Sequence, residues 1–539
     1  MSLGITGLIL LISLIFNPNR NLQNWLKIDI QKVSLIILLV SISIIFCLFA
    51  FKNTPPLKNN PLVNRLTTFN LSDASSLSRV FVTKVGLNCF LQKPLLGYGF
   101  DNFEICFQKN FDPMITNVLP KETRFDKTHN MPVEILATTG IIGFIFFIGI
   151  YFYGFKNVRD LILTDNIDFY AGLSLILGIT AYFIQNLFVF DVYEGFLALT
   201  LLLSFIVFLK NDHKININIP KTWSNPIIVG LTIIILFTIY QFNVLVWYYD
   251  GFVKKINHLT SNGQADIALN ILKNTKIKTP YSDTLYYGFF DIFIKNQKNL
   301  TQKQLFDYYA IAFENQKRLS DQYPYRVRIY LSQLVHIASK AINPQIGIND
   351  QDIQKTLNIL DTVKKLGLRL SELDFYEIQI LLNSKNPADW VLGEQLAKEF
   401  VELYSESGKF HWIYGIYLID KRNNSEEGIK QLKLSYEKNL VFESIDQLMT
   451  TISRLNKYHE SELAIVIINR YLPSNPTRYQ IYMELARAYI NLKDYQPAKE
   501  ALDQANQIYL SQRATKYNSS VEANLKDLQN QLNNLKTQP

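Results

Sequence analysis

Long apolar stretches in the first half of the chain constrain its fold more than any other feature of the sequence. A helix needs about 20 mostly apolar residues to cross a bilayer, where its backbone polar groups must be satisfied internally. The apolar stretches end at Tyr249, and the remainder is charged and rich in Tyr, Gln, Asn and Lys. We therefore predict a helical membrane domain over residues 1–249 with about six spans. The stretches are Leu3–Phe16, which is short, Val33–Phe51, Val133–Gly154, Tyr170–Phe190, Gly195–Leu209 and Pro226–Tyr248.

Basic residues in short loops predict the orientation of these spans. Lysine and arginine accumulate in short cytoplasmic loops, whereas long loops cross the membrane largely regardless of charge. Three short loops are basic, and the turn Val192–Glu194 carries no positive residue. With the basic loops inside, the spans alternate consistently, and the long loop 52–130 and everything after Tyr249 lie outside. We expect a multi-pass protein of the cytoplasmic membrane. The basic residues are Arg20, Lys27, Lys32, Lys156, Arg159, Lys210, Lys214 and Lys221.

A repeat organises the second half of the chain. Aromatic and small residues recur there at the spacing of the tetratricopeptide (TPR) unit, which is about 34 residues long. We predict a TPR-like α-solenoid over residues 250–510, with a concave surface for a partner. For Tyr281–Leu403 the register is poor, and a non-repeating helical bundle stays open. Residues 511–539 are predicted to be a frayed helix that becomes disordered. The residues in register include Leu448, Ile452, Leu455, Ala464, Ile468, Tyr482, Leu485, Ala486, Tyr489, Ala498, Leu502 and Ala505.

Charge and cysteine content exclude several classes of function. The net charge of +8 is spread along the chain without a basic stripe, so we expect no nucleic-acid partner. Three cysteines exclude a disulfide framework and a cysteine-based zinc site. Cys89 and Cys106 share the long loop, where both a bridge and free thiols remain open. The loop has no phosphate-loop, zinc-helix or serine-elbow motif.

The end of the long loop contains the first candidate residues. Pro132 suits the first turn of a helix that then becomes purely apolar. His129 and Asn130 would then lie at the membrane surface, at the positive end of a helix dipole, a position that favours anions such as phosphates. The alternative is that the two residues only cap a transmembrane helix.

Cations elsewhere in the long loop are further candidates for binding an anion. Ser78–Leu87 reads as a partly apolar helix that carries Arg79 and Lys84. A tight turn with two glycines follows at Pro94–Phe103, because glycine permits torsions that other residues resist. Arg124 precedes His129 by a few residues.

Three segments in combination resemble the signature region of the O-antigen ligase and O-antigen polymerase family. They are Pro94–Phe103, Thr128–Asn130 and Glu134–Gly143, and the resemblance covers roughly residues 75–209. Members of this family are bacterial membrane glycosyltransferases. The resemblance implies an all-α, GT-C-like membrane domain that transfers an oligosaccharide from a polyprenyl diphosphate to an acceptor hydroxyl. The transfer takes place at the outer face of the inner membrane, without a nucleotide sugar or a required metal.

The same resemblance implies roles for the candidate residues. Arg79 would neutralise the diphosphate leaving group, because a guanidinium binds phosphate oxygens in a fork. His129 would take the proton from the acceptor or orient the leaving phosphate, since an imidazole exchanges protons near neutral pH. Arg124, Lys84 and Asn130 would contribute to substrate binding. The acceptor would be a lipid, a glycan or a protein.

A second hypothesis comes from a different class of protein. Only Leu3–Phe51 precedes the signature region, so the membrane domain is expected to be N-terminally short compared with family members. Under this hypothesis, the chain is a membrane-anchored TPR scaffold for envelope proteins, and its ligase-like domain is truncated or inactive. Under the first hypothesis, the solenoid helps to recruit the acceptor or envelope proteins to an active transferase.

Overall fold

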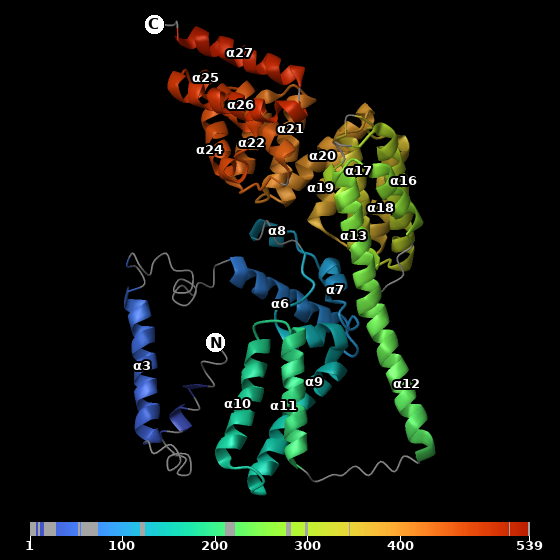
Figure 1. Ribbon diagram of the computed structural model, residues 1–539, viewed down its shortest axis with the longest axis vertical. Coiled ribbons are helices and arrows are strands. Elements are labelled where there is room, and N and C mark those ends of the chain that lie inside the picture. The colour runs from blue at the N-terminus through green and yellow to red at the C-terminus, as the bar shows by residue number, and fades with distance from the viewer. Residues whose placement is uncertain are drawn as a thin grey trace. The chain divides into compact units, whose positions relative to one another are not determined.

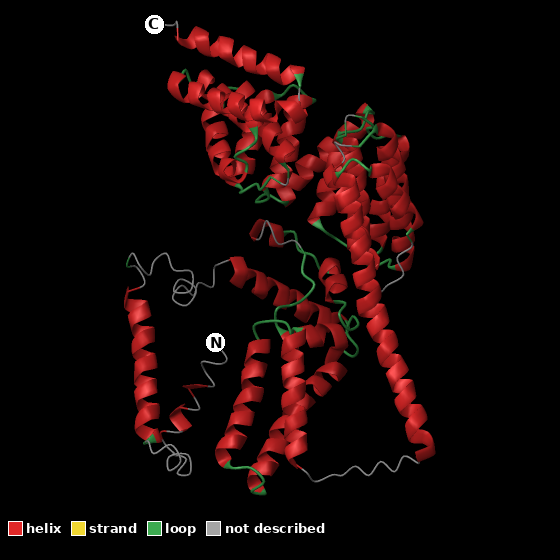
Figure 2. Cartoon of the chain, in the orientation of Figure 1, coloured by secondary structure: helices red, strands yellow, loops and turns green. Residues whose placement is uncertain are grey.

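The protein is helical throughout the residues that its structure, a computed structural model, describes (Figure 2). Among these residues there is no strand, and the predicted all-α class is confirmed. The helices form two compact units, Met1–Tyr376 and Glu377–Pro539, which we treat separately. The structure describes residues 7–8, 11–13, 15, 29–51, 54, 74–118, 124–210, 221–275, 282–296, 300–343, 345–442, 444–516 and 518–536.

Four stretches in the described part of the chain are long and apolar enough to cross a membrane. They lie in α3 (Ile30–Phe51), α9 (Met131–Leu163), α10 (Phe169–Asn186) and the continuous helix Ile228–Ser261. Each corresponds to a predicted span. The predicted span Gly195–Leu209 lies within α11 (Tyr193–Lys210), whereas most of Leu3–Phe16 falls outside the described residues.

Helices α9, α10 and α11 pack side by side in the first unit (Figure 1). Their shared core contains Tyr151, Val158 and Ile179, which are buried. On the outside of the bundle, Phe146 is 72% exposed and Phe208 is 75% exposed. Apolar surface of this kind is typical of helices that face lipid, because in water it would favour aggregation.

The region between α3 and α9 contains a small helical subdomain. Its helices are α6 (Ala74–Gln92), α7 (Phe103–Lys109) and α8 (Met114–Val118). A disulfide joins Cys89 of α6 to Cys106 of α7, with the two Cα atoms 6.0 Å apart. Helix α7 packs against α6, and its Phe103 and Phe107 are fully buried. The pairing that the sequence left open is therefore present.

The first unit continues beyond the last predicted span without a break in the helix. Helix α12 (Lys221–Ile239) passes through the π-helical turn η1 (Tyr240–Val244) into α13 (Leu245–Ser261), so residue 249 lies inside a helix. Aromatic residues, among them Tyr286, Phe293 and Tyr308, form the core of the following helices. These helices are α14 (Ala265–Asn274), α15 (Ser282–Asn296), α16 (Gln302–Gln322), α17 (Val327–Ala341), α18 (Asp350–Lys365) and the start of α19 (Ser371–Leu382).

Consecutive helices pair closely in the second unit. A Cβ on Gly415 would lie 2.9 Å from the Gly428 carbonyl oxygen, so small residues let α21 and α22 touch, as the repeat pattern predicts. Assignment to the TPR family stays a prediction. The helices are α20 (Pro387–Leu403), α21 (Gly408–Asp420), α22 (Ser425–Glu437), α23 (Ile445–Lys457), α24 (Ser461–Tyr471), η3 (Leu472–Ser474), α25 (Tyr479–Asn491), α26 (Tyr495–Lys516) and α27 (Ser519–Lys536).

The last segment differs from the frayed, disordered tail that the sequence predicted. Helix α27 covers Ser519–Lys536 and packs against α25 and α26. Its Leu525, Leu528 and Leu532 are buried, because their spacing places them on one face of the helix. The prediction gave too much weight to the polar composition and overlooked this leucine stripe.

Candidate functional site

The membrane helix α9 is interrupted at Gly140. Its torsions there, φ 67° and ψ −166°, are not helical. A break of this kind frees the carbonyls of Ala137 and Thr138 and the N–H groups of Ile141 and Ile142. In the apolar part of a membrane protein, each of these groups needs a new partner.

The glycine-containing turn after α6 supplies all four partners. The N–H groups of Tyr98 and Gly99 donate to the carbonyls of Ala137 and Thr138, at 3.0 and 2.7 Å. In return, the N–H groups of Ile141 and Ile142 donate to Pro94 O (2.8 Å) and Leu95 O (3.4 Å). The turn Pro94–Gly99 is thus inserted into the break in α9. We call this arrangement the splice.

Glycine is required on both sides of the splice. Gly97 and Gly140 have φ values of 64° and 67°, which L-residues with a side chain rarely adopt. A Cβ on Gly97 would lie 2.4 Å from the carbonyl carbon of Thr138, and one on Gly140 would lie 2.3 Å from Leu95 O. Two of the three segments of the predicted signature, Pro94–Phe103 and Glu134–Gly143, therefore meet in one contact between backbones.

A tight cap at the start of α9 fixes the loop that precedes it. Asn130 is the N-cap residue, and its Oδ1 accepts a hydrogen bond from the Val133 N–H at 3.1 Å. Asn130 Nδ2 donates to Leu187 O at the end of α10 (3.0 Å), and Thr128 Oγ1 donates to Asn130 O (2.7 Å). Both polar ends of the Asn130 side chain are thus used within the protein. Pro132 has no N–H, and the N–H of Val133 already donates to Asn130. The cap therefore uses part of the donor capacity at the positive end of α9.

His129 is held in a strained backbone conformation within this cap. Its φ of 56° lies in the left-handed region, which costs a residue with a side chain about 1–2 kcal/mol. The imidazole is half-buried, with its centroid 6.3 Å from the Phe125 ring and 5.3 Å from the Phe190 ring. Strain that the surroundings maintain is commonly found at functional residues. His129 is one of seven non-glycine residues in the described part of the chain with a positive φ, and its role stays a prediction.

Glu134 is the residue at this site that the sequence analysis passed over. Its side chain is only 4% exposed, and its Oε2 accepts a hydrogen bond from the Thr128 N–H at 2.8 Å. The other oxygen, Oε1, is buried and has no hydrogen-bond partner within the described residues. A single carboxylate at the start of an apolar span was the available signal, because ionisable residues in such segments are usually functional.

The two predicted cations of α6 lie on different faces of that helix. Helix α6 crosses the loop before His129 at Gly86, where a Cβ would lie 2.9 Å from Thr128 Cγ2. Arg79 is exposed and lies about two turns earlier on the same face, about 10 Å along the helix axis. Lys84 is also exposed but is rotated by about 200° from Gly86. Arg79 is therefore on the face of α6 that meets the loop, and Lys84 is on the opposite face.

Two further cations of the loop, Arg124 and Lys127, have acidic partners. Arg124 Nε lies 3.9 Å from Glu372 Oε1 at the start of α19. Lys127, two residues before His129, forms an ion pair with Asp101 in the turn after the splice. Within the described residues, no group of three or more His, Cys, Asp or Glu side chains is arranged to hold a metal ion.

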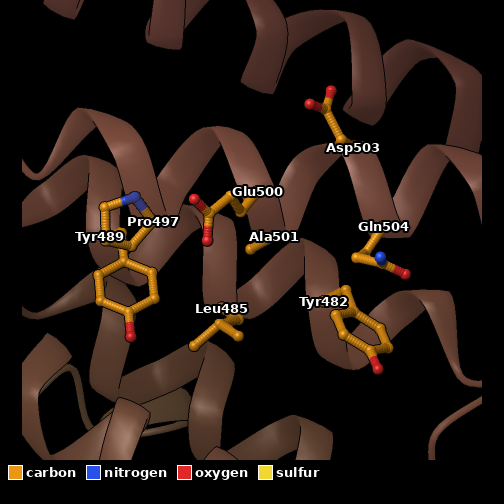
Figure 3. Close-up of a pocket in the computed structure, with 8 residues that line it drawn as sticks. All are labelled: Tyr482, Leu485, Tyr489, Pro497, Glu500, Ala501, Asp503 and Gln504. Carbon is orange, nitrogen blue, oxygen red and sulfur yellow. The ribbon is translucent and has the colours of Figure 1, made fainter.

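A separate pocket lies within the second unit. Its volume is about 460 Å³. Figure 3 shows Tyr482, Leu485 and Tyr489 of α25 on one side and residues of α26, including Glu500 and Gln504, on the other. None of the predicted site residues lines this pocket.

A comparison with known protein families found a match in the first unit. Residues 2–148 match the O-antigen ligase family. This segment contains the two parts of the splice, which are the turn Pro94–Gly99 and the break at Gly140. It also contains His129 and the N-cap residue Asn130. A comparison with curated proteins found no match. The family match supports a ligase-like glycosyltransferase in a membrane, and it covers only the first part of the chain.

Proposed function

We propose that the protein transfers a glycan from a polyprenyl diphosphate carrier to an acceptor hydroxyl at the outer face of the bacterial cytoplasmic membrane. The observation that carries the proposal is the left-handed conformation of His129 where α9 begins, between Thr128 and Asn130, whose hydrogen bonds restrain the loop. The family match of residues 2–148 supports the same class of reaction.

The proposed chemistry assigns one step to each of two side chains. The acceptor oxygen attacks the anomeric carbon of the donor sugar, and the bond from that carbon to the diphosphate oxygen breaks. His129 takes the proton that the acceptor hydroxyl releases. Arg79 binds the diphosphate and stabilises the charge that develops on it, since guanidinium–phosphate contacts are charge-assisted. The donor glycan is the substrate, and the proposal requires no cofactor.

Further residues have supporting roles in this proposal. Arg124 and Lys84 contribute positive charge for the approach of the anionic donor. Asn130 acts on substrate binding indirectly, because its side chain is committed to the cap and to α10.

The disulfide supports the proposed location of the reaction. Bridges such as Cys89–Cys106 persist in oxidising compartments and are rare in the cytosol. The positive-inside pattern of the short loops favours an outside location for the same segment. We therefore propose a multi-pass protein of the inner membrane, with α6–α8 and the helices after α13 on the extracytoplasmic side.

A matched set of substitutions tests the proposal. His129→Ala and Arg79→Ala should each lower glycan transfer at least about 100-fold while the protein still accumulates in the membrane. Lys84→Ala removes a cation from the opposite face of the same helix and should have a much smaller effect. Normal transfer by the His129 or the Arg79 variant would refute the roles assigned to them.

The second candidate is a membrane-anchored scaffold that binds envelope proteins through its second unit. The pocket between α25 and α26 favours it, because two tyrosines beside polar groups are a common composition for a binding surface (Figure 3). Under this alternative, Tyr482→Ala with Tyr489→Ala would remove the phenotype of the protein, and His129→Ala would leave it unchanged.

A further inference from the structure

We infer that Glu134 is a positioning residue for His129, and that it acts through the hydrogen bond it accepts from the Thr128 backbone. This inference rests on the proposed function. Glu134 Oε2 lies 2.8 Å from Thr128 N, so the side chain reaches back across the start of α9 to the backbone N–H of the residue that precedes His129. Removing this bond loosens the side of the loop before His129, where the bond from the Thr128 hydroxyl to Asn130 O remains.

The loop around His129 is held from two directions. Asn130 fixes the side that follows His129, through Val133 N and Leu187 O. Glu134 fixes the preceding side. A left-handed histidine relaxes toward ordinary torsions unless both neighbours are restrained, because the strained form is the less stable one. The two restraints together set the direction in which the imidazole leaves the backbone.

Helix capping alone does not account for a buried carboxylate at this position. Elsewhere in the first unit, Asp352 of α18 is also a buried first-turn carboxylate, and it is well satisfied. Its Oδ2 accepts from Asn349 N at 3.1 Å and from Lys340 Nζ at 2.6 Å. Glu134 has no such cation in hydrogen-bond contact within the described residues, and its Oε1 is left without a partner.

A half-satisfied buried carboxylate costs stability, since burial of an unpaired polar oxygen costs about 1–3 kcal/mol. Such a group is retained where its single contact is needed. The contact here is with the backbone N–H of Thr128, the residue that precedes His129.

Two conservative variants separate the hydrogen bond from the charge. Glu134→Gln keeps an acceptor oxygen at the same reach but is neutral. Glu134→Asp keeps the charge but is one methylene too short to reach Thr128 N. Positioning predicts that the Gln variant retains transfer within about 3-fold, whereas the Asp variant loses about 10- to 100-fold in kcat with little change in KM. The opposite order would show that the charge matters and would overturn the inference.

Thr138→Val is the matched control. Thr138 lies one turn further along α9, is equally buried, and its Oγ1 donates only to the Glu134 carbonyl at 2.7 Å. This variant should transfer glycan normally. An equal loss in Thr138→Val and Glu134→Asp would mean that any disturbance of this turn impairs the enzyme, and it would refute a specific role for Glu134.

A double mutant ties the effect to His129. In a His129→Ala background, Glu134→Asp should cause no further loss of residual transfer, because the residue that it positions is absent. Full additivity of the two losses would contradict the inference. If His129→Ala itself retained full transfer, the proposed function would fail. If it abolished transfer while Glu134→Asp had no effect, only the positioning role would fail.

Discussion

The backbone N–H of Ile141 donates a hydrogen bond of 2.8 Å to the carbonyl of Pro94, a residue of the turn that follows α6. In an uninterrupted helix, this N–H would donate to Ala137 O, which instead accepts from Tyr98 N. The exchange joins the small helical subdomain to α9 through main-chain atoms. The loop with His129 therefore lies next to a connection made of backbone hydrogen bonds. Side-chain substitutions elsewhere do not easily disturb such bonds.

Alanine at either glycine of the splice should destabilise the protein strongly. Gly97→Ala and Gly140→Ala each place a Cβ against backbone atoms that cannot move away, at a positive φ. We expect each to lower the free energy of unfolding by about 2–4 kcal/mol. Gly149→Ala is the control, because no atom lies within 4 Å of its Cβ position, and it should be neutral or stabilising by up to about 1 kcal/mol. Thermal unfolding in detergent micelles measures all three, and equal midpoints would contradict the splice.

The sequence predicted the parts of this site but not how they fit together. Apolar run lengths predicted the four described stretches that could cross a membrane, and Pro132 correctly indicated the start of a helix just after His129. The insertion of Pro94–Gly99 into α9 was not predictable from periodicity, because it depends on main-chain atoms of two segments distant in sequence. Glu134 was read as part of an apolar span, since hydropathy averages over single residues. The rotation of Lys84 away from Arg79 became apparent only when Gly86 identified the face of α6 that packs.

An ion pair connects the small helical subdomain to the helices after the last span. Arg328 Nε of α17 lies 3.1 Å from Glu104 Oε1 of α7, and Arg369 N donates to Gln108 O nearby at 3.2 Å. Glu104→Arg and Arg328→Glu should each make residues 103–110 exchange amide hydrogens faster. The double reversal should restore most of the protection, with a coupling energy of about 0.5–1 kcal/mol. No recovery in the double variant would show that the contact does not hold the two parts together.

The bridge between Cys89 and Cys106 determines how many thiols can react before and after reduction. Denatured without reductant, the protein should react with maleimide at one thiol, Cys47, and after reduction at three. Loss of the bridge in the Cys89→Ser/Cys106→Ser variant should cost about 3 kcal/mol of stability for a loop of 17 residues. Three reactive thiols before reduction, in protein isolated from membranes with free thiols blocked, would contradict both the bridge and the oxidising location.

The buried His336 of α17 should make the helices after α13 sensitive to mild acid. Burial lowers the pKa of His336 to about 4, and its Nε2 lies 2.5 Å from the hydroxyl of the equally buried Tyr308. The unfolded chain takes up this proton near pH 6.5, whereas the folded protein resists it until about pH 4. Stability is therefore fully present above pH 6.5 and falls as the pH drops toward 4, by about 3 kcal/mol in total.

The measurement compares the wild type with His336→Gln between pH 7.5 and pH 4. The variant should be less stable at neutral pH, because glutamine does not reproduce the contacts of the ring, but its stability should change less over the same interval. The difference in slope isolates the histidine from carboxylates, which titrate at the lower end of this range in both proteins. Parallel pH profiles would show that His336 takes up its proton in the folded protein, against its complete burial between Tyr308 and the Ser332 carbonyl.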